Sequence, residues 1–185
     1  MTCQNIIAVV KELRDKYKTG DPAELCRMMN ILLLKQPMGT GESSVKGFFV
    51  EKYRVRAITL NSELSPESAR IITAHELGHA VLHGGSGLDL YSDADIFRQS
   101  SRLEREANLF AAELLLSDSE VLSTLNRDNS FFTAAAELFV PVELLDYKFH
   151  IMRTKGYHLV APPITARNKF LKDMEVKGDD GEEGC

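Results

Sequence analysis

The sequence lacks the features that mark secreted, membrane-spanning or nucleic-acid-binding chains. Its three cysteines are an odd number without C-x-x-C spacing, so we expect no disulfide framework. No apolar run approaches the roughly 18 residues of a membrane span, and residues 1–5 do not resemble the start of a signal peptide. A net charge of −5 argues against a surface built to bind nucleic acid. These absences predict a cytoplasmic protein that is not bound to a membrane.

The sequence does contain the pentad H-E-L-G-H at residues 75–79, inside a stretch, residues 66–83, that is typical of a helix. Histidines four apart on a helix share a face, with their Cβ atoms roughly 5–6 Å apart, so His75 and His79 can bind one cation. Imidazole nitrogens suit Zn²⁺, and Glu76 is placed to act as the general base on a water that zinc activates. The alternative is a chance pentad on a helix surface, and the helical setting argues against it.

A catalytic zinc needs a third protein ligand, and the metzincin pattern, with a further glycine and histidine after the pentad, does not match this sequence. The other solution is a glutamate from a second helix, and residues 102–116 supply three. At about 100° per residue, helical phase places Glu104 beside the apolar stripe of this helix. The same phase places Glu106 and Glu113 on a flank that we expect to be solvated. Glu104 is therefore the predicted third ligand.

Other polar residues near the pentad are less specific. Asn108, one turn after Glu104, is either an outer partner that orients a ligand or a surface asparagine. His83 continues the histidine row but falls at the end of the helix, where the helix dipole favours a histidine, so we do not expect it to be a ligand. Asp93 and Asp95 are rival third ligands, in a connection that we expect to cover the site.

The pentad at residues 75–79, followed by E-x-E-A-N-x-F-A-A-x-L-L at residues 104–115, resembles the ImmA/IrrE family of small metallopeptidases. Residues 57–61 also resemble the strand that enters the zinc helix in that family. The likeness covers residues 21–150. One difference lies at Ser117, where the family often has proline, and it affects only how the second helix ends.

The resemblance implies a gluzincin-like zinc endopeptidase in which His75, His79 and Glu104 bind Zn²⁺ and Glu76 is the catalytic glutamate. It also implies an antirepressor role, the cleavage of a helix-turn-helix transcriptional repressor encoded nearby. In the zinc peptidases that this family resembles, a sheet edge beside the metal helix pairs with extended substrate. Two alternatives remain: an antirepressor that binds its partner without cutting it, and a DNA-binding regulator that contains a zinc site.

We expect an α+β fold, mainly helical and zincin-like, with a small three-stranded sheet. The strands are predicted at residues 31–34, 48–51 and 54–60, and the last two should be antiparallel. Residues 131–149 predict a helix, a turn and a helix, a pair that resembles a helix-turn-helix. The second helix of the pair lacks a basic stripe, so we expect it to pack on the zinc helices and not to bind DNA.

These assignments divide the chain into three parts. Residues 1–125 are the predicted metallopeptidase domain, residues 126–165 a helical subdomain packed on it, and residues 166–185 an acidic tail that we expect to be disordered. Three side chains are candidate hydrogen-bond donors to the oxyanion: His150, Tyr157 and His158. For each of them we favour a purely structural role.

Overall fold

The computed structural model describes residues 1–41, 44–84, 96–126 and 130–159, with only the backbone for residues 96–101. Asp93, Asp95 and the predicted acidic tail lie outside the described residues. The described elements, in chain order, are α1 (Cys3–Tyr17), α2 (Pro22–Met28), β1 (Ile31–Gln36), β2 (Gly47–Lys52), β3 (Val55–Asn61), α3 (Pro66–Leu82), α4 (Ile96–Leu115), α5 (Asp118–Leu125), α6 (Phe131–Glu137) and α7 (Val142–Thr154). This arrangement confirms the expected α+β class, mainly helical with a small sheet.

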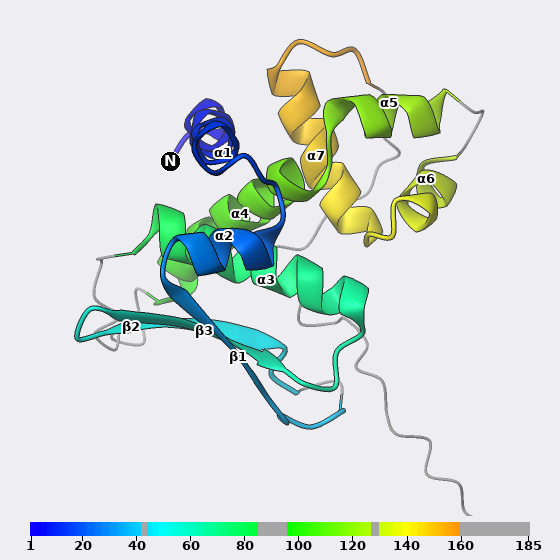
Figure 1. The fold of residues 1–185 in the computed structure, drawn as a ribbon. Helices are drawn as coiled ribbons and strands as arrows, with labels where there is room; N and C mark the ends of the chain where they lie inside the picture. Colours follow the sequence, from blue (N-terminus) through cyan, green and yellow to red (C-terminus); the bar gives the residue numbers. More distant parts are fainter. Residues whose placement is uncertain (42–43, 85–95, 127–129, 160–185) are drawn as a thin grey trace, which may run out of the picture.

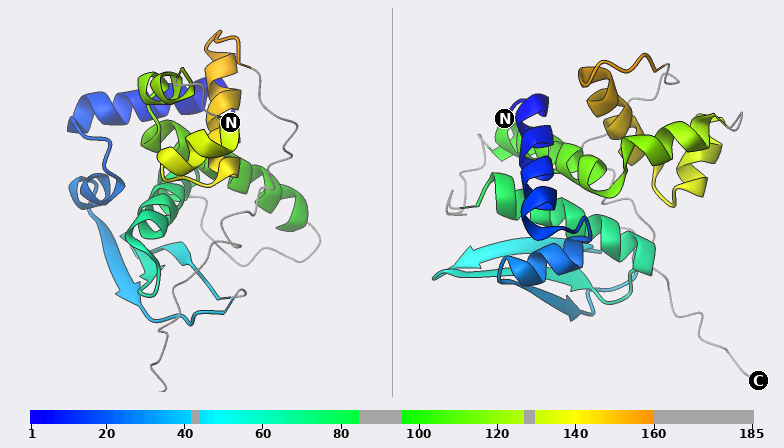
Figure 2. Two further views of the ribbon diagram at one scale, coloured as in Figure 1. Left: turned by 90° about the vertical axis from the view of Figure 1, so that its right-hand side faces the viewer. Right: turned by 45° about the horizontal axis from the view of Figure 1, so that its top comes forward.

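The elements form layers that begin at the sheet (Figure 1). Helices α2 and α3 pack against the strands, and α4 packs against α3. Helices α1 and α7 pack in turn against α4, on the side away from the sheet (Figure 2). Among the described residues, no helix has the length and apolar character needed to cross a membrane. Helix α4 therefore lies at the centre of the helical part.

The sheet has the order β1-β3-β2, which places β3 in the middle and β2 at an edge. Strands β2 and β3 are antiparallel, as predicted, whereas β1 runs parallel to β3. Ile58 and Leu60 of β3 are buried, and β2 as well as β3 contacts α3. The sheet edge formed by β2 therefore lies beside α3, the helix that carries the pentad.

The helix that carries the pentad begins where the sequence predicts. The Ser65 hydroxyl accepts a hydrogen bond from the backbone N–H of Ser68, and Pro66 occupies the first turn. A capping box between Ser117 and Glu120 starts α5. The two caps fix the start of α3 and the turn after α4.

The prediction that one flank of α4 is solvated is wrong. Glu106 is only 6% exposed and Glu113 only 9%, and every residue from 106 to 116 is buried. The reason is that α1, α3 and α7 surround this helix, whereas phase analysis of one helix assumes one buried face. Both glutamates are instead held by charged partners.

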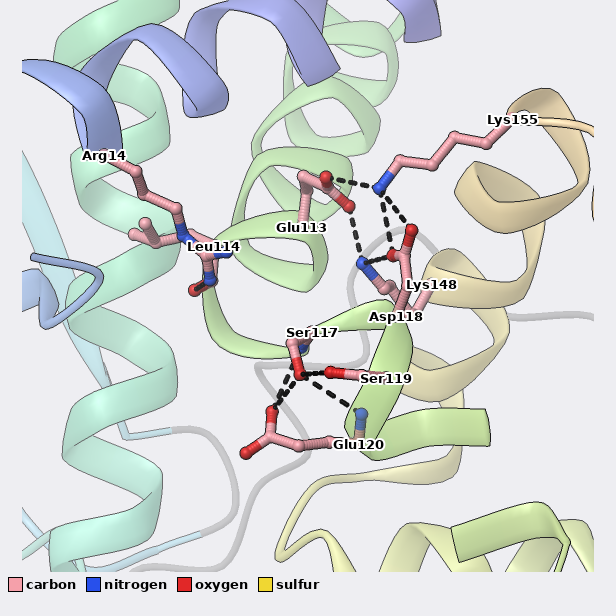
Figure 3. Close-up of polar contacts among 9 residues, drawn as sticks. All are labelled: Arg14, Glu113, Leu114, Ser117, Asp118, Ser119, Glu120, Lys148 and Lys155. Carbon is pink, nitrogen blue, oxygen red and sulfur yellow. Dashed lines mark hydrogen bonds and ion pairs between the residues drawn. The ribbon is translucent and has the colours of Figure 1, made fainter. Parts of the chain in front are cut away.

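Glu113 belongs to a group of four charged side chains that joins α4, α5 and α7 (Figure 3). The Lys148 ammonium, whose side chain is 1% exposed, lies 2.6 Å from both the Glu113 and the Asp118 carboxylates. Lys155 lies 2.7 Å from Glu113 and 2.9 Å from Asp118. Two cations thus balance two carboxylates, and Lys148 offers no charge to a partner outside the protein.

We expect Lys148→Met to lower the free energy of unfolding by about 3 kcal/mol at pH 7, because removing one partner leaves buried carboxylates short of positive charge. Burial raises the pKa of Asp118, but hydrogen bonds from Lys148 and Lys155 outweigh burial and lower it overall. A lowered pKa means that the ion pairs stabilise the fold above the unfolded-state pKa of about 4 and lose this effect as the pH falls.

The difference in stability between wild type and Lys148→Met should therefore shrink below about pH 4, as measured by urea denaturation across the pH range. Lys11→Met, on the exposed side of α1, is the control and should change stability by less than about 0.5 kcal/mol. An equal loss at low and neutral pH would contradict the electrostatic explanation.

Candidate metal centre

Two of the predicted ligands lie one turn apart on α3. His75 is 5% exposed and His79 is half-buried. Their Nε2 atoms lie 3.2 Å apart, so both imidazoles turn the same nitrogen toward one point. This is the geometry that the i, i+4 spacing predicts for a shared cation.

The third predicted ligand reaches the same point from α4. The Glu104 carboxylate lies 3.4 Å from His75 Nε2 through one oxygen and 3.4 Å from His79 Nε2 through the other. Among the described residues, these three form the group of histidine, cysteine and acidic side chains that could hold a metal ion. The structure thus brings together the three side chains that the sequence analysis selected.

The charges in this cluster favour a bound cation. Burial alone would raise the pKa of Glu104, but hydrogen bonds with His75 and His79 outweigh burial and lower it well below its usual range. Burial alone would lower the pKa of His79, but the Glu104 hydrogen bond and the charges of Glu76 and Glu104 raise it. Glu104 thus presents a negative charge to the two imidazole rings, and such surroundings suit a divalent ion.

Glu76 lies next to the cluster and faces the edge strand of the sheet. Burial raises the pKa of Glu76, while the positive character of His75 and His79 and a hydrogen bond from the backbone N–H of Phe49 act in the opposite direction. Phe49 is a residue of β2. The carboxylate is therefore positioned by α3 on one side and by the sheet edge on the other.

Asn108 is fully buried, so the alternative reading of a surface asparagine is wrong. Its side chain hydrogen-bonds Tyr147 of α7, a residue that the sequence analysis did not select. Burial raises the pKa of Tyr147, and the Asn108 hydrogen bond acts against it. In the sequence, the helical spacing of Tyr147 from Leu144 and Ile151, which are buried, indicates a core position and gives no sign of the contact with Asn108.

His83 follows the last residue of α3 as its C-cap, in agreement with the predicted helix end. Its Nδ1 lies 3.2 Å from Nδ1 of His79, and its Nε2 lies 3.1 Å from the Glu106 carboxylate. Burial and the neighbouring His79 lower the pKa of His83, although the Glu106 hydrogen bond acts against them. His83 is thus in contact with the cluster through His79.

Glu106 also accepts a hydrogen bond of 2.9 Å from Arg102 Nε and contacts the amino group of Met1. Burial would raise the pKa of Glu106, but the hydrogen bonds from Met1, Arg102 and His83 outweigh it and lower the pKa to about 2. Glu106 is therefore an ionised, buried carboxylate at neutral pH.

The three candidate oxyanion donors lie outside the cluster of His75, His79 and Glu104. His150, near the end of α7, is half-buried, and its Nε2 lies 3.4 Å from the Arg105 guanidinium. Tyr157 and His158 are exposed and follow α7. None of the three is in the group that could hold a metal ion.

Comparison with known proteins identifies the family of the chain. The family model described as the IrrE N-terminal-like domain, Peptidase_M78, matches residues 26–150. The chain is 34% identical over 143 residues to "Uncharacterized immunity region protein 2" of Bacillus phage phi105. The aligned region covers 77% of this chain and 88% of the relative.

Two further relatives are named as metallopeptidases. "Metallopeptidase ImmA" of Bacillus subtilis is 27% identical over 151 residues, covering 80% of this chain and 85% of the relative. "Radiation response metalloprotease IrrE" of Deinococcus deserti is 30% identical over 138 residues, covering 71% of this chain and 47% of the relative. These matches confirm the resemblance seen in the motifs. The chain belongs to the IrrE N-terminal-like family, Peptidase_M78, and is a metallopeptidase of the ImmA/IrrE type.

Proposed function

We propose that the protein is a zinc-dependent endopeptidase in which His75, His79 and Glu104 hold the ion. The observation that carries this proposal is the spacing of the three donors. In a tetrahedral site with zinc–ligand distances of about 2.0–2.1 Å, neighbouring ligand atoms are about 3.3–3.4 Å apart. The two Nε2 atoms are 3.2 Å apart, and each lies 3.4 Å from a different oxygen of Glu104. The two rings therefore have the separation that a tetrahedral zinc needs, with the carboxylate within reach of both.

Glu76 is the proposed general base. When bound, zinc polarises the scissile carbonyl and makes a water acidic enough to be deprotonated near neutral pH. Glu76 lies on the same helix as the two histidines, next to them and to the sheet edge, so its carboxylate can take the proton from that water. It then gives the proton to the leaving amine.

Strand β2 is the proposed docking edge for an extended substrate. It is an edge strand, it contacts α3, and the Phe49 N–H on its outer side bonds Glu76, which supports a position of this edge beside the proposed base. Because ladder groups alternate along an antiparallel strand, the backbone of Glu51 faces the same way as that of Phe49. A peptide paired along this edge would pass Glu76.

A helix-turn-helix repressor encoded nearby is the proposed substrate. The family resemblance supports this choice, and so does the immunity region in the name of the phage relative. The DNA-binding alternative has little support from α7, because Lys148 is buried in ion pairs and Lys155 is engaged by Glu113 and Asp118. The protein would thus act on a repressor and not on its operator.

The role of Glu76 is tested by Glu76→Gln, which keeps the shape of the side chain and removes the base. We expect cleavage of the neighbouring repressor to fall by at least about 10²–10⁴-fold, since a positioned acid–base group supplies that factor. Zinc content should not change. Intact mass of the repressor, after incubation with each protein, measures the reaction and locates the scissile bond. If neither protein cuts but both release the repressor from its operator, the protein acts by binding alone.

The ligand role of Glu104 is tested by zinc affinity, measured by competition with a chelator. Glu104→Gln should lose more than the roughly 10–100-fold that loss of an outer partner costs. Glu113→Gln, a buried glutamate on the same helix, is the matched control and should bind zinc as the wild type does. Full zinc affinity in Glu104→Gln would mean that Glu104 is not the third ligand and would favour Asp93 or Asp95 in that role.

The docking edge is tested by Glu51→Pro, which removes the Glu51 N–H from the outer side of β2 and, because ladder groups alternate, no bond to β3. Loss of one hydrogen bond to substrate should raise KM about 3- to 10-fold at unchanged kcat. Glu51→Ala retains the backbone N–H and separates the effect of the side chain. Equal KM values for the proline and alanine variants would show that this edge does not bind the substrate backbone.

A further inference from the structure

We propose that His83 and Glu106 are positioning residues that hold the ring proton of His79 on Nδ1 and so keep its Nε2 free to bind the metal. The inference rests on the proposed metal site, of which His79 is a ligand. It concerns two residues that the ligand set does not include, one at the end of α3 and one on α4.

The three side chains form a continuous line of hydrogen bonds. His79 Nδ1 lies 3.2 Å from His83 Nδ1, and His83 Nε2 lies 3.1 Å from a Glu106 oxygen. The other Glu106 oxygen accepts the 2.9 Å hydrogen bond from Arg102 Nε. The line therefore ends on a carboxylate whose second oxygen is already occupied by a permanent cation.

The positions of the protons follow from the chemistry of each group. An ionised carboxylate only accepts hydrogen bonds, so His83 must donate from Nε2 to Glu106. A neutral imidazole has one donor and one acceptor, so Nδ1 of His83 accepts. His79 must then donate from its own Nδ1, which leaves a lone pair on its Nε2. With His83 neutral, this is the one arrangement of protons that satisfies both the His83–Glu106 and the His79–His83 contacts.

This arrangement opposes a competing one at the metal site. In the absence of metal, Glu104 lies 3.4 Å from His79 Nε2 and would favour a proton on that nitrogen. A proton there would block the metal, since only the unprotonated nitrogen binds. The pull of His83 and Glu106 on the other ring nitrogen therefore favours the tautomer that can bind.

Two further observations support a specific role for this line. Its members are shielded from water, with side chains 12% exposed in His83 and 7% exposed in Glu106, which strengthens hydrogen bonds between them. The other histidine of the pentad has no such support: Nδ1 of His75 is buried and has no hydrogen-bond partner among the described residues. The two ligand histidines are therefore oriented by different means.

The experiment measures zinc affinity, by chelator competition, and the stability of the metal-free protein for full-length wild type, His83→Phe and Glu106→Gln. Phenylalanine keeps a ring at position 83 and removes both nitrogens, and glutamine keeps the shape of Glu106 without its charge. We expect both variants to bind zinc about 10–100-fold more weakly. Glu113→Gln is again the control: it should lower the stability of the metal-free protein without weakening zinc binding.

A second measurement is nitrogen NMR of the zinc-loaded wild type, which assigns the proton of each imidazole directly. We expect His79 to be protonated on Nδ1 and His83 on Nε2. A proton on Nδ1 of His83, or wild-type zinc affinity in both variants, would overturn the inference while leaving the metal site intact. Failure of the wild type to bind zinc, or full affinity in Glu104→Gln, would instead refute the proposed metal site.

Discussion

The close contact between α3 and α4 determines whether the candidate metal centre can exist. At Gly78 an added Cβ would lie 3.2 Å from the Cα of Ala107 and 3.1 Å from the Phe110 ring, closer than ordinary packing allows. The glycine of the pentad therefore lets the two helices approach at the level of the two histidines. Glu104, about one turn before Ala107, reaches both Nε2 atoms as a result. A wider separation would leave two histidines without their carboxylate.

The central position of α4 explains why its three glutamates each have a partner on another element. A buried carboxylate without positive charge nearby costs several kcal/mol, and this helix has no solvated flank after residue 105 in the described structure. Glu104 faces the histidines of α3, Glu106 faces His83 and Arg102, and Glu113 faces Lys148 and Lys155. Charges spaced along one helix thus fix it against α3 on one side and α7 on the other.

Local signals in the sequence predicted much of this structure, and the limits of the prediction have a physical cause. The start of the pentad helix at residue 66 was predicted correctly, because the signals that start a helix, here the Ser65 cap, act on the backbone next to them. Phase analysis selected Glu104 for the cluster, yet it also placed Glu106 and Glu113 in solvent. The number of helices that surround α4 depends on packing between distant segments, so the periodicity of apolar residues within α4 cannot predict that number. The order β1-β3-β2 and the approach of Tyr147 to Asn108 depend on long-range packing in the same way.

The row of histidines on α3 shows how one repeated spacing can place three rings in different surroundings. His75, His79 and His83 recur every fourth residue, so one face of the helix carries all three rings. The three rings face different carboxylates: Glu104 contacts the rings of His75 and His79, and Glu106 contacts the ring of His83. Because Glu104 and Glu106 are only two residues apart on α4, they project in different directions, and His83 is held away from the point that His75 and His79 share. The chemistry of each histidine is therefore set by the carboxylate opposite it, and the spacing of the row sets only which rings can contact one another.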